Sequence, residues 1–195
     1  MVSTVKIPMF PLAIFPLPGE LVPLHIFEPR YKQLIEEVEK TDISFGIYFN
    51  HVMNEGRLGS LVKLESVLKR YPAGESDIIV RCIDLFNMNT LYRNYKDRTY
   101  PGGDVNYWKV DQTVLASENL IEPFKDYLRL MNISKMPVNT TLFNIANELN
   151  LDVQDKIKFV MLDTRKKNSL LLSRINYQSH LLAEAERLKD KFHLN

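Results

Sequence analysis

Residues 7–34 constrain the fold of this chain most, because prolines break up an apolar run there that leads straight into an amphipathic helix. Proline fixes its own φ angle, lacks an N–H and pushes the preceding residue toward extended geometry. The five prolines ahead of the helix are Pro8, Pro11, Pro16, Pro18 and Pro23. The segment is therefore predicted to form short strands joined by sharp corners, and nothing in it implies a catalytic group.

A helix is predicted to begin at Glu28-Pro29, because proline is well tolerated at the first helical position. Apolar residues then recur at i, i+3, i+4 and i+7, which places them on one buried face. They are Tyr31, Leu34, Ile35 and Val38. The Pro18-Gly19 pair upstream predicts a turn between two strands.

The first half of the chain reads as β structure around this helix. A long hairpin is expected where Pro72-Ala73-Gly74-Glu75 separates two β-like runs, and Pro101-Gly102-Gly103 is predicted to be a loop. The predicted strands are residues 5–9, 21–26, 45–49, 58–71, 77–88, 92–100 and 105–110, the last holding the single tryptophan, Trp108.

After about residue 111 the apolar period changes from two to about 3.6, which predicts helices. Four are expected: one from Ser117 to Met131, one opening at Thr140 or Thr141, one over residues 153–162 capped by Asp152, and one over 169–192. Their predicted inward residues are Leu120, Phe124, Tyr127, Leu128 and Met131; Leu142, Ile145, Ala146 and Leu149; and Leu171, Ile175, Leu182, Leu188 and Phe192. We therefore expect a β-rich subdomain over 1–112 and an α-helical subdomain over 113–195.

Composition narrows the class of function. Twenty-five Lys and Arg against 24 Asp and Glu give a net charge of +1, so no global field draws the protein to nucleic acid or to anionic lipid. Cys82 is the single cysteine, which excludes an internal disulfide and a cysteine-based zinc site. There is no leader of signal-peptide form at Met1, and no apolar run approaches the length of a membrane span. We expect a cytoplasmic protein with neither a membrane nor a nucleic-acid partner.

The run Leu24-His25-Ile26-Phe27-Glu28-Pro29-Arg30-Tyr31 resembles the helix start of the Lon protease N-terminal, substrate-binding domain family. Gly59-Ser60, where the family usually has Gly-Thr, and the helical segment 142–162 are further similarities in the same order. The resemblance implies an α+β fold in which a PUA-like pseudo β-barrel precedes a C-terminal helical bundle. It also implies a module that recognises protein or peptide substrates, as a stand-alone bacterial member.

Two departures from the family and one missing motif limit what the resemblance implies. This chain has Cys82 and Leu85 where the family tends to have glycine and arginine, so any role of that arginine is lost or moved here. The phosphate-binding motif of the Lon ATPase, G-x-x-x-x-G-K-[ST], is absent. We therefore expect no enzyme activity by the Lon route and no cofactor.

Other candidate chemistry in the sequence has little support. Ser66 and Lys69 match S-x-x-K, but they lie in a predicted strand where three residues separate side chains onto opposite faces. His25, His51, His180 and His193 are scattered, so no metal site is predicted. Cys82 alternates onto an apolar face and is expected to be an inert core thiol, with Arg81 on the opposite face. The basic run 165–167 is expected in a solvated loop between helices.

The candidate binding surface consists of apolar residues in the proline-broken segment. Phe10, Phe15, Leu17 and Leu21 line a peptide-binding groove if they are exposed. If they close the end of the barrel instead, they are structural. In the family motif, His25 is expected to be packed with one hydrogen-bonded nitrogen. Glu28 is expected to be favoured by the helix dipole, and Arg30 to reach Glu36 or Glu37 if local geometry allows; the alternative is that Glu28 and Arg30 are functional at the strand-to-helix corner.

Two further hypotheses stay open beside a non-catalytic protein- or peptide-binding module. The first is a small-molecule-binding protein or enzyme that uses the cleft of the PUA-like fold, which requires convergent polar groups and perturbed carboxylates. The second is nucleic-acid binding, which requires a basic stripe. The sequence leaves open the identity of the partner, the oligomeric state and any joint action with a separate Lon protease.

Overall fold

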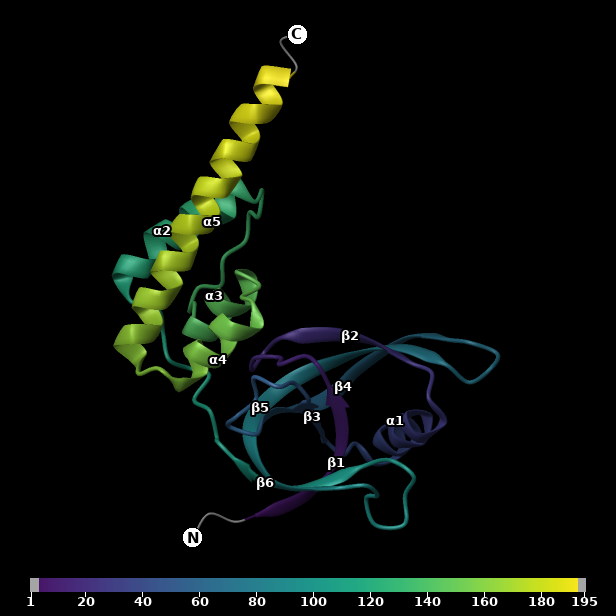
Figure 1. The fold of residues 1–195 in the computed structure, drawn as a ribbon. Helices are drawn as coiled ribbons and strands as arrows, with labels where there is room; N and C mark the ends of the chain where they lie inside the picture. Colours follow the sequence, from purple (N-terminus) through teal and green to yellow (C-terminus); the bar gives the residue numbers. More distant parts are fainter. Residues whose placement is uncertain (1–3, 193–195) are drawn as a thin grey trace. The chain divides into compact units, whose positions relative to one another are not determined.

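The structure, a computed structural model, describes residues 4–192, with side chains described as far as Leu188. The chain divides into two compact units, Met1–Asp111 and Gln112–Asn195. All the strands and one helix belong to the first unit, and four helices belong to the second (Figure 1). The α+β class predicted from the sequence is confirmed.

Six strands in the first unit form a sheet that closes on itself. Its order is β2-β5-β4-β3-β1-β6, and β5 also pairs with β6, so that five of the strands make a barrel and β2 is added at its edge. The elements are β1 (Val5–Leu12), β2 (Leu21–Ile26), α1 (Pro29–Thr41), β3 (Phe45–Phe49), β4 (Leu58–Arg70), β5 (Ser76–Tyr92) and β6 (Gly102–Tyr107). The predicted hairpin is confirmed as β4 and β5.

The length of β5 allows the barrel to close. Its first part pairs with β2, where His25 lies opposite Asp77, and its last part pairs with β6, where Tyr92 lies opposite Gly102. Strand β2 pairs with no other strand among the described residues. Proline is tolerated in a strand whose other edge is free, which accounts for Pro23.

Glycines let the barrel interior close around aromatic rings. A Cβ atom built on Gly59 would lie 2.2 Å from Cζ of Phe86, which is fully buried. The neighbouring Ser60 is buried too, and its hydroxyl donates to the Pro16 carbonyl at 2.7 Å. The Gly59-Ser60 pair therefore serves packing on one side and anchors the proline-broken segment on the other.

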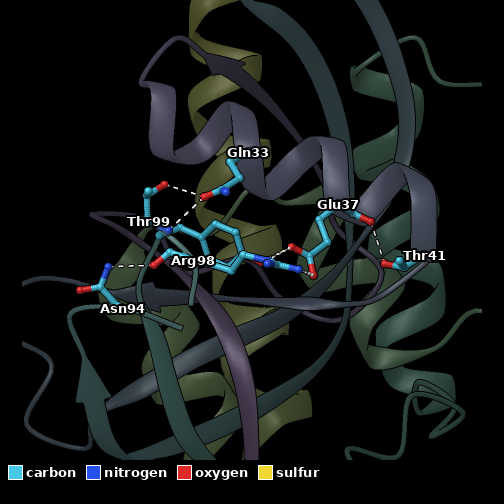
Figure 2. Close-up of polar contacts among 7 residues, drawn as sticks. Gln33, Glu37, Thr41, Asn94, Arg98 and Thr99 are labelled. Carbon is cyan, nitrogen blue, oxygen red and sulfur yellow. Dashed lines mark hydrogen bonds and ion pairs between the residues drawn. The ribbon is translucent and has the colours of Figure 1, made fainter. Parts of the chain in front are cut away.

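Helix α1 packs by the four residues that its periodicity predicted: Tyr31, Leu34, Ile35 and Val38 are buried. Its opposite side holds the segment after β5 in place (Figure 2). Gln33 Oε1 accepts hydrogen bonds from the backbone N–H and the hydroxyl of Thr99, and Glu37 binds Arg98 through an Nε–Oε2 contact of 2.6 Å. The Tyr100 hydroxyl also donates to Glu37.

This anchoring corrects two strand predictions. Residues 93–100 form turns and bends rather than a strand, because the segment folds back on itself through Tyr95 and Tyr100 and its end is bound to α1 by Arg98 and Thr99. The last strand begins at Gly102 and ends at Tyr107, so the predicted Pro-Gly-Gly loop is partly strand and Trp108 lies just beyond it. A Cβ atom on Gly103 would lie 3.0 Å from the Thr90 carbonyl oxygen and 2.8 Å from Cε of Met9, so glycine lets β6 pass close to both.

The second unit holds α2 (Glu118–Leu130), α3 (Leu142–Glu148), α4 (Val153–Met161) and α5 (Thr164–Phe192). Thr141 and Asn144 form a reciprocal capping box at α3, and Asp152 caps α4 as predicted. An ion pair links α4 to α5: Nε of Arg174 lies 2.5 Å from Oδ2 of Asp155, whose side chain is buried. In Figure 1, α5 runs along α2 and continues past α3 and α4.

Three helical predictions are corrected. Helix α5 begins at Thr164, so the basic run 165–167 lies in its first turn, where the Lys167 ammonium sits over the rings of Phe143 and Phe159. Met131 and Leu188 are exposed instead of facing inward, since each lies near a helix end. The side chain of Phe192 falls outside the described residues.

Candidate functional site

The family-like motif spans the corner between β2 and α1. Ile26 and Tyr31, on either side of the corner, are buried and fix it to the core. Between them Phe27 is turned outward, with 58% of its surface exposed. Glu28 is the N-cap residue and makes no side-chain cap hydrogen bond. Its carboxylate instead accepts a hydrogen bond from Arg30, with 2.9 Å between Nε and Oε2. The corner is thus anchored to the core on both sides, and it presents one large aromatic side chain to solvent.

A cluster of polar and aromatic side chains stands beside this corner. Nδ1 of His25 lies 2.6 Å from Oδ1 of Asp77, and the Tyr71 hydroxyl donates to the other oxygen of the same carboxylate at 2.7 Å. The His25 ring stacks on Phe27, with centroids 6.0 Å apart, and meets Tyr71 edge-on at 5.8 Å. The Lys69 ammonium lies 4.5 Å from the centre of the Tyr71 ring. Residues from β2, the β4–β5 hairpin and the corner therefore support one another.

The electrostatics of the cluster favour a structural carboxylate. Hydrogen bonds from His25 and then from Tyr71 hold the pKa of Asp77 below its usual range. The same bond to Asp77 raises the pKa of Tyr71. A carboxylate that stays ionised is a fixed acceptor, whereas an acid catalyst near neutral pH needs a raised pKa. The ionised Asp77 therefore holds His25, whose ring stacks on Phe27.

Apolar side chains continue along β2 from this cluster. Leu21, Pro23 and His25 alternate onto the exposed side of the strand, and 49% of the Leu21 surface is open to solvent. We call Leu21, Pro23, His25 and Phe27, with Tyr71 and Asp77 on the hairpin, the β2 face. Its character is apolar and aromatic, with one bridged carboxylate.

Comparison with known proteins identifies the family. The sequence matches the family described as "ATP-dependent protease La (LON) substrate-binding domain" over residues 6–189. The chain belongs to the Lon substrate-binding domain family. No curated protein matches the sequence.

Solved structures show the same fold. One is a Lon N-terminal domain protein from Xanthomonas campestris, with a TM-score of 0.67 at 18% identity, covering 87% of this chain and 98% of the other. The N-terminal domain of the Lon protease of the Mycobacterium avium complex gives a TM-score of 0.60 at 12% identity, covering 88% and 98%. The match over residues 6–189 confirms the family inferred from the Leu24–Tyr31 motif, and these structures confirm the fold.

For three of the four residues considered for a binding surface, burial favours the alternative in which they close the barrel. Phe10, Phe15 and Leu17 are buried, and only Leu21 is exposed. Phe10 stacks on Tyr31 with centroids 3.9 Å apart, and Phe15 packs near Phe49. The Ser60 hydroxyl holds the Pro16 carbonyl, which folds the segment inward so that these side chains close the barrel.

His25 was expected to be packed, with one nitrogen hydrogen-bonded. The hydrogen bond is present, but the side chain is about half exposed, since β2 is an edge strand. Tyr71 and Asp77 were missed as site residues because sequence alone marks them only as the borders of a turn. Their role depends on the strand register that places Asp77 opposite His25. In the sequence, the only signal for this role is weak: a polar residue, Asp77, near the start of a strand and close to an aromatic residue, Tyr71.

The remaining sequence candidates do not form a site. A bulge between Val67 and Lys69 undoes the strand alternation, so Ser66 and Lys69 pair with Ile79 and Asp77, which share a face, contrary to the prediction. Lys69 nevertheless directs its ammonium to the Tyr71 ring. Cys82 and Leu85, the two departures from the family, are both buried, and burial raises the pKa of the Cys82 thiol.

No metal-binding group emerges either. Among residues 4–188, no three His, Cys, Asp or Glu side chains gather as metal ligands would. His180 is exposed on α5, and His193 lies outside the described residues. Within the described part of the chain, none of the helices combines the length and apolarity that crossing a bilayer requires.

Proposed function

We propose that the protein is a non-catalytic binding module that holds unfolded or extended protein segments on the β2 face. The observation that carries the proposal is the exposure of Phe27 and Leu21 on a support anchored to the core. Leu21 and Phe27 lie at opposite ends of one exposed strand face, with Pro23 and His25 between them, and exposed apolar surface of this kind marks interaction sites in soluble proteins. Family membership supports a substrate-binding role, and the charge balance of +1 favours apolar over electrostatic recognition.

Side chains, more than strand addition, carry this recognition. The free edge of β2 could in principle accept another strand, as in β-augmentation. Pro23 in the middle of β2 has no N–H to donate, so an added strand would lose a hydrogen bond there. Binding through Phe27 and Leu21 instead tolerates many sequences, because apolar contacts are not directional. The proposal thus favours segments rich in large apolar residues. We place this activity in the cytoplasm, where a single thiol such as Cys82 remains reduced.

The test is binding of a fluorescently labelled, permanently unfolded protein, with all cysteines reduced and blocked, followed by fluorescence anisotropy. The native, folded form of the same protein serves as the competitor that should not bind. Burying one large apolar side chain contributes about 1.5–3 kcal/mol. We therefore expect the double variant Leu21→Ser/Phe27→Ser to weaken binding at least about tenfold.

A matched control is available in the helical unit. Val138 is fully exposed, so Val138→Ser removes the same kind of surface away from the β2 face and should leave binding unchanged. Circular dichroism confirms that each variant is folded. Absence of binding by the folded wild type, or equal binding by the wild type and the double variant, would reject the proposal.

A further inference from the structure

A second apolar surface lies in the helical unit, apart from the β2 face. Between α2, the end of α3 and α5 there is an open hollow of about 380 Å³, which we call the α2–α5 hollow. Met131, Leu149, Leu181 and Leu182 supply its apolar lining. Met131 is 42% exposed and Leu181 is 50% exposed. The hollow is therefore accessible to a side chain from outside.

Exposed apolar side chains continue from the hollow along α5, interrupted once by Glu184, which is paired with Arg187. Tyr177, Leu181 and Leu188 are all exposed, and at 100° per residue they lie within about 40° of one another around the helix. With a rise of 1.5 Å per residue, the stripe that these three residues form is about 16 Å long. A hollow lined by apolar side chains, with further apolar positions along the same helix face, matches the surface on which an amphipathic helix docks.

The negative charge of Glu148 beside the hollow indicates which kind of helix would bind there. Glu148 lines the hollow, and within the described residues its carboxylate forms no ion pair. Tyr127 lines the same hollow as Glu148, and its pKa is raised by burial first and then by the negative charge of Glu148. Two cations on the helices that line the hollow are paired on their own helices, Arg129 with Asp126 and Arg187 with Glu184. One unpaired negative charge thus stands beside an apolar hollow.

We infer that the α2–α5 hollow and the stripe are the docking site for an amphipathic helix of a partner protein that carries lysine or arginine beside its apolar face. One large apolar side chain of that helix enters the hollow, and the adjacent cation meets Glu148. The remaining apolar residues lie along Tyr177 and Leu188. This surface is independent of the β2 face, so either proposal can fail without the other.

The probes are two designed helical peptides with leucines at i, i+3, i+4 and i+7. One peptide carries lysines beside the leucine face, and the other has glutamates at those positions. Each is labelled with fluorescein and titrated with the full chain in an anisotropy assay. We expect the lysine peptide to bind at least several times more tightly, with a preference that shrinks at high salt because exposed charges are screened.

Three variants assign the binding to this site. Met131→Ser/Leu181→Ser should weaken the lysine peptide about tenfold or more, which corresponds to about 1.4 kcal/mol. Glu148→Gln, an exposed change that should not affect folding, should reduce the preference for lysine by about two- to fivefold, the range of one surface ion pair. Phe27→Ser, on the β2 face, should change nothing.

Several outcomes would overturn the inference. Equal affinity for both peptides would remove the role of Glu148, and unchanged binding by a folded Met131→Ser/Leu181→Ser variant would place the site elsewhere. Light scattering decides the remaining case. If the wild type is a dimer that this double variant converts to a monomer, the stripe is covered by a second copy of the chain and does not dock a partner helix.

Discussion

His25 and Asp77 face each other across the pairing of β2 with β5, with 2.6 Å between Nδ1 and Oδ1, although 52 residues separate them in the sequence. The other oxygen of Asp77 accepts the Tyr71 hydroxyl. One carboxylate therefore connects the edge strand to the tip of the β4–β5 hairpin. This connection holds the His25 ring against Phe27, the exposed centre of the β2 face.

The stability contributed by this connection should depend on pH. The pKa of Asp77 is lowered in the folded chain, so its ionised form stabilises the fold fully above the ordinary aspartate range, and this contribution is lost as pH falls through the lowered value. We expect Asp77→Asn to be less stable than the wild type at pH 7. The difference should shrink between about pH 4 and pH 2, near and below the unperturbed aspartate pKa.

Urea unfolding of both proteins at several pH values measures this difference. Asp97→Asn is the matched control, because Asp97 is an exposed carboxylate that forms no ion pair within the described residues. Its curve should follow that of the wild type at every pH. A difference between Asp77→Asn and the wild type that stays constant down to pH 2 would contradict the prediction.

Local sequence patterns correctly predicted those elements whose bounds and buried faces depend only on nearby residues. Strands β2 and β3 have the predicted bounds, and α1 buries the four predicted residues because a helical face depends only on spacing. Residues 93–100 could not be predicted in the same way. Their conformation depends on Gln33 and Glu37, which lie more than 60 residues earlier.

The same distinction applies to the candidate site. The motif located the corner at Phe27, but the burial of Phe15 and Leu17 depends on a hydroxyl from Ser60, 44 residues beyond Pro16. Strand alternation failed at Lys69 because a bulge is a tertiary feature with no clear local signal here. The sequence motif therefore predicted the location of the candidate site, whereas contacts between distant residues determine which of its side chains are exposed.

Gly59 should tolerate no side chain. An added Cβ atom would lie 2.2 Å from Cζ of Phe86 and 2.9 Å from the Ile47 carbonyl oxygen, so the ring and the adjacent strand must both shift. Overpacking of this kind costs about 1–3 kcal/mol or more. Gly56→Ala is the control, since its Cβ atom would meet only the Leu58 side chain, at 3.3 Å. Thermal unfolding should separate the two variants, and a Gly59→Ala protein as stable as Gly56→Ala would show that the barrel is looser than described.

Cys82 should be unreactive in the folded protein. It is 1% exposed, and burial first, then the negative charge of Glu20, raises its pKa, so the reactive thiolate is scarce. A chromogenic disulfide reagent at pH 8 should detect one thiol per chain in denaturant and react slowly without it. The rate should rise with urea in parallel with unfolding. Fast reaction in native buffer would mean that the β2–β5 region opens locally.

The ion pair of Arg174 with Asp155 should stabilise the helical unit more than the exposed pairs do. Asp155 has 5% of its side chain exposed, and Arg174 contacts both of its oxygens, through Nη2 at 2.8 Å and Nε at 2.5 Å. Arg174→Met leaves a buried carboxylate without its partner, which should cost about 2–4 kcal/mol, reduced from the fully buried case because the arginine is partly open to water. Urea unfolding monitored by helical circular dichroism measures the loss.

Two further variants separate the contribution of the Arg174 charge to stability from the contribution of its side-chain packing. Arg187→Met breaks the exposed pair with Glu184 on the same helix and should cost less than about 1 kcal/mol. Asp155→Leu/Arg174→Met removes both charges together, and it should recover most of the lost stability, because an apolar pair has no unpaired charge to desolvate. If the double variant were no more stable than Arg174→Met, the arginine would act through its packing against α4, and the ion pair would contribute little.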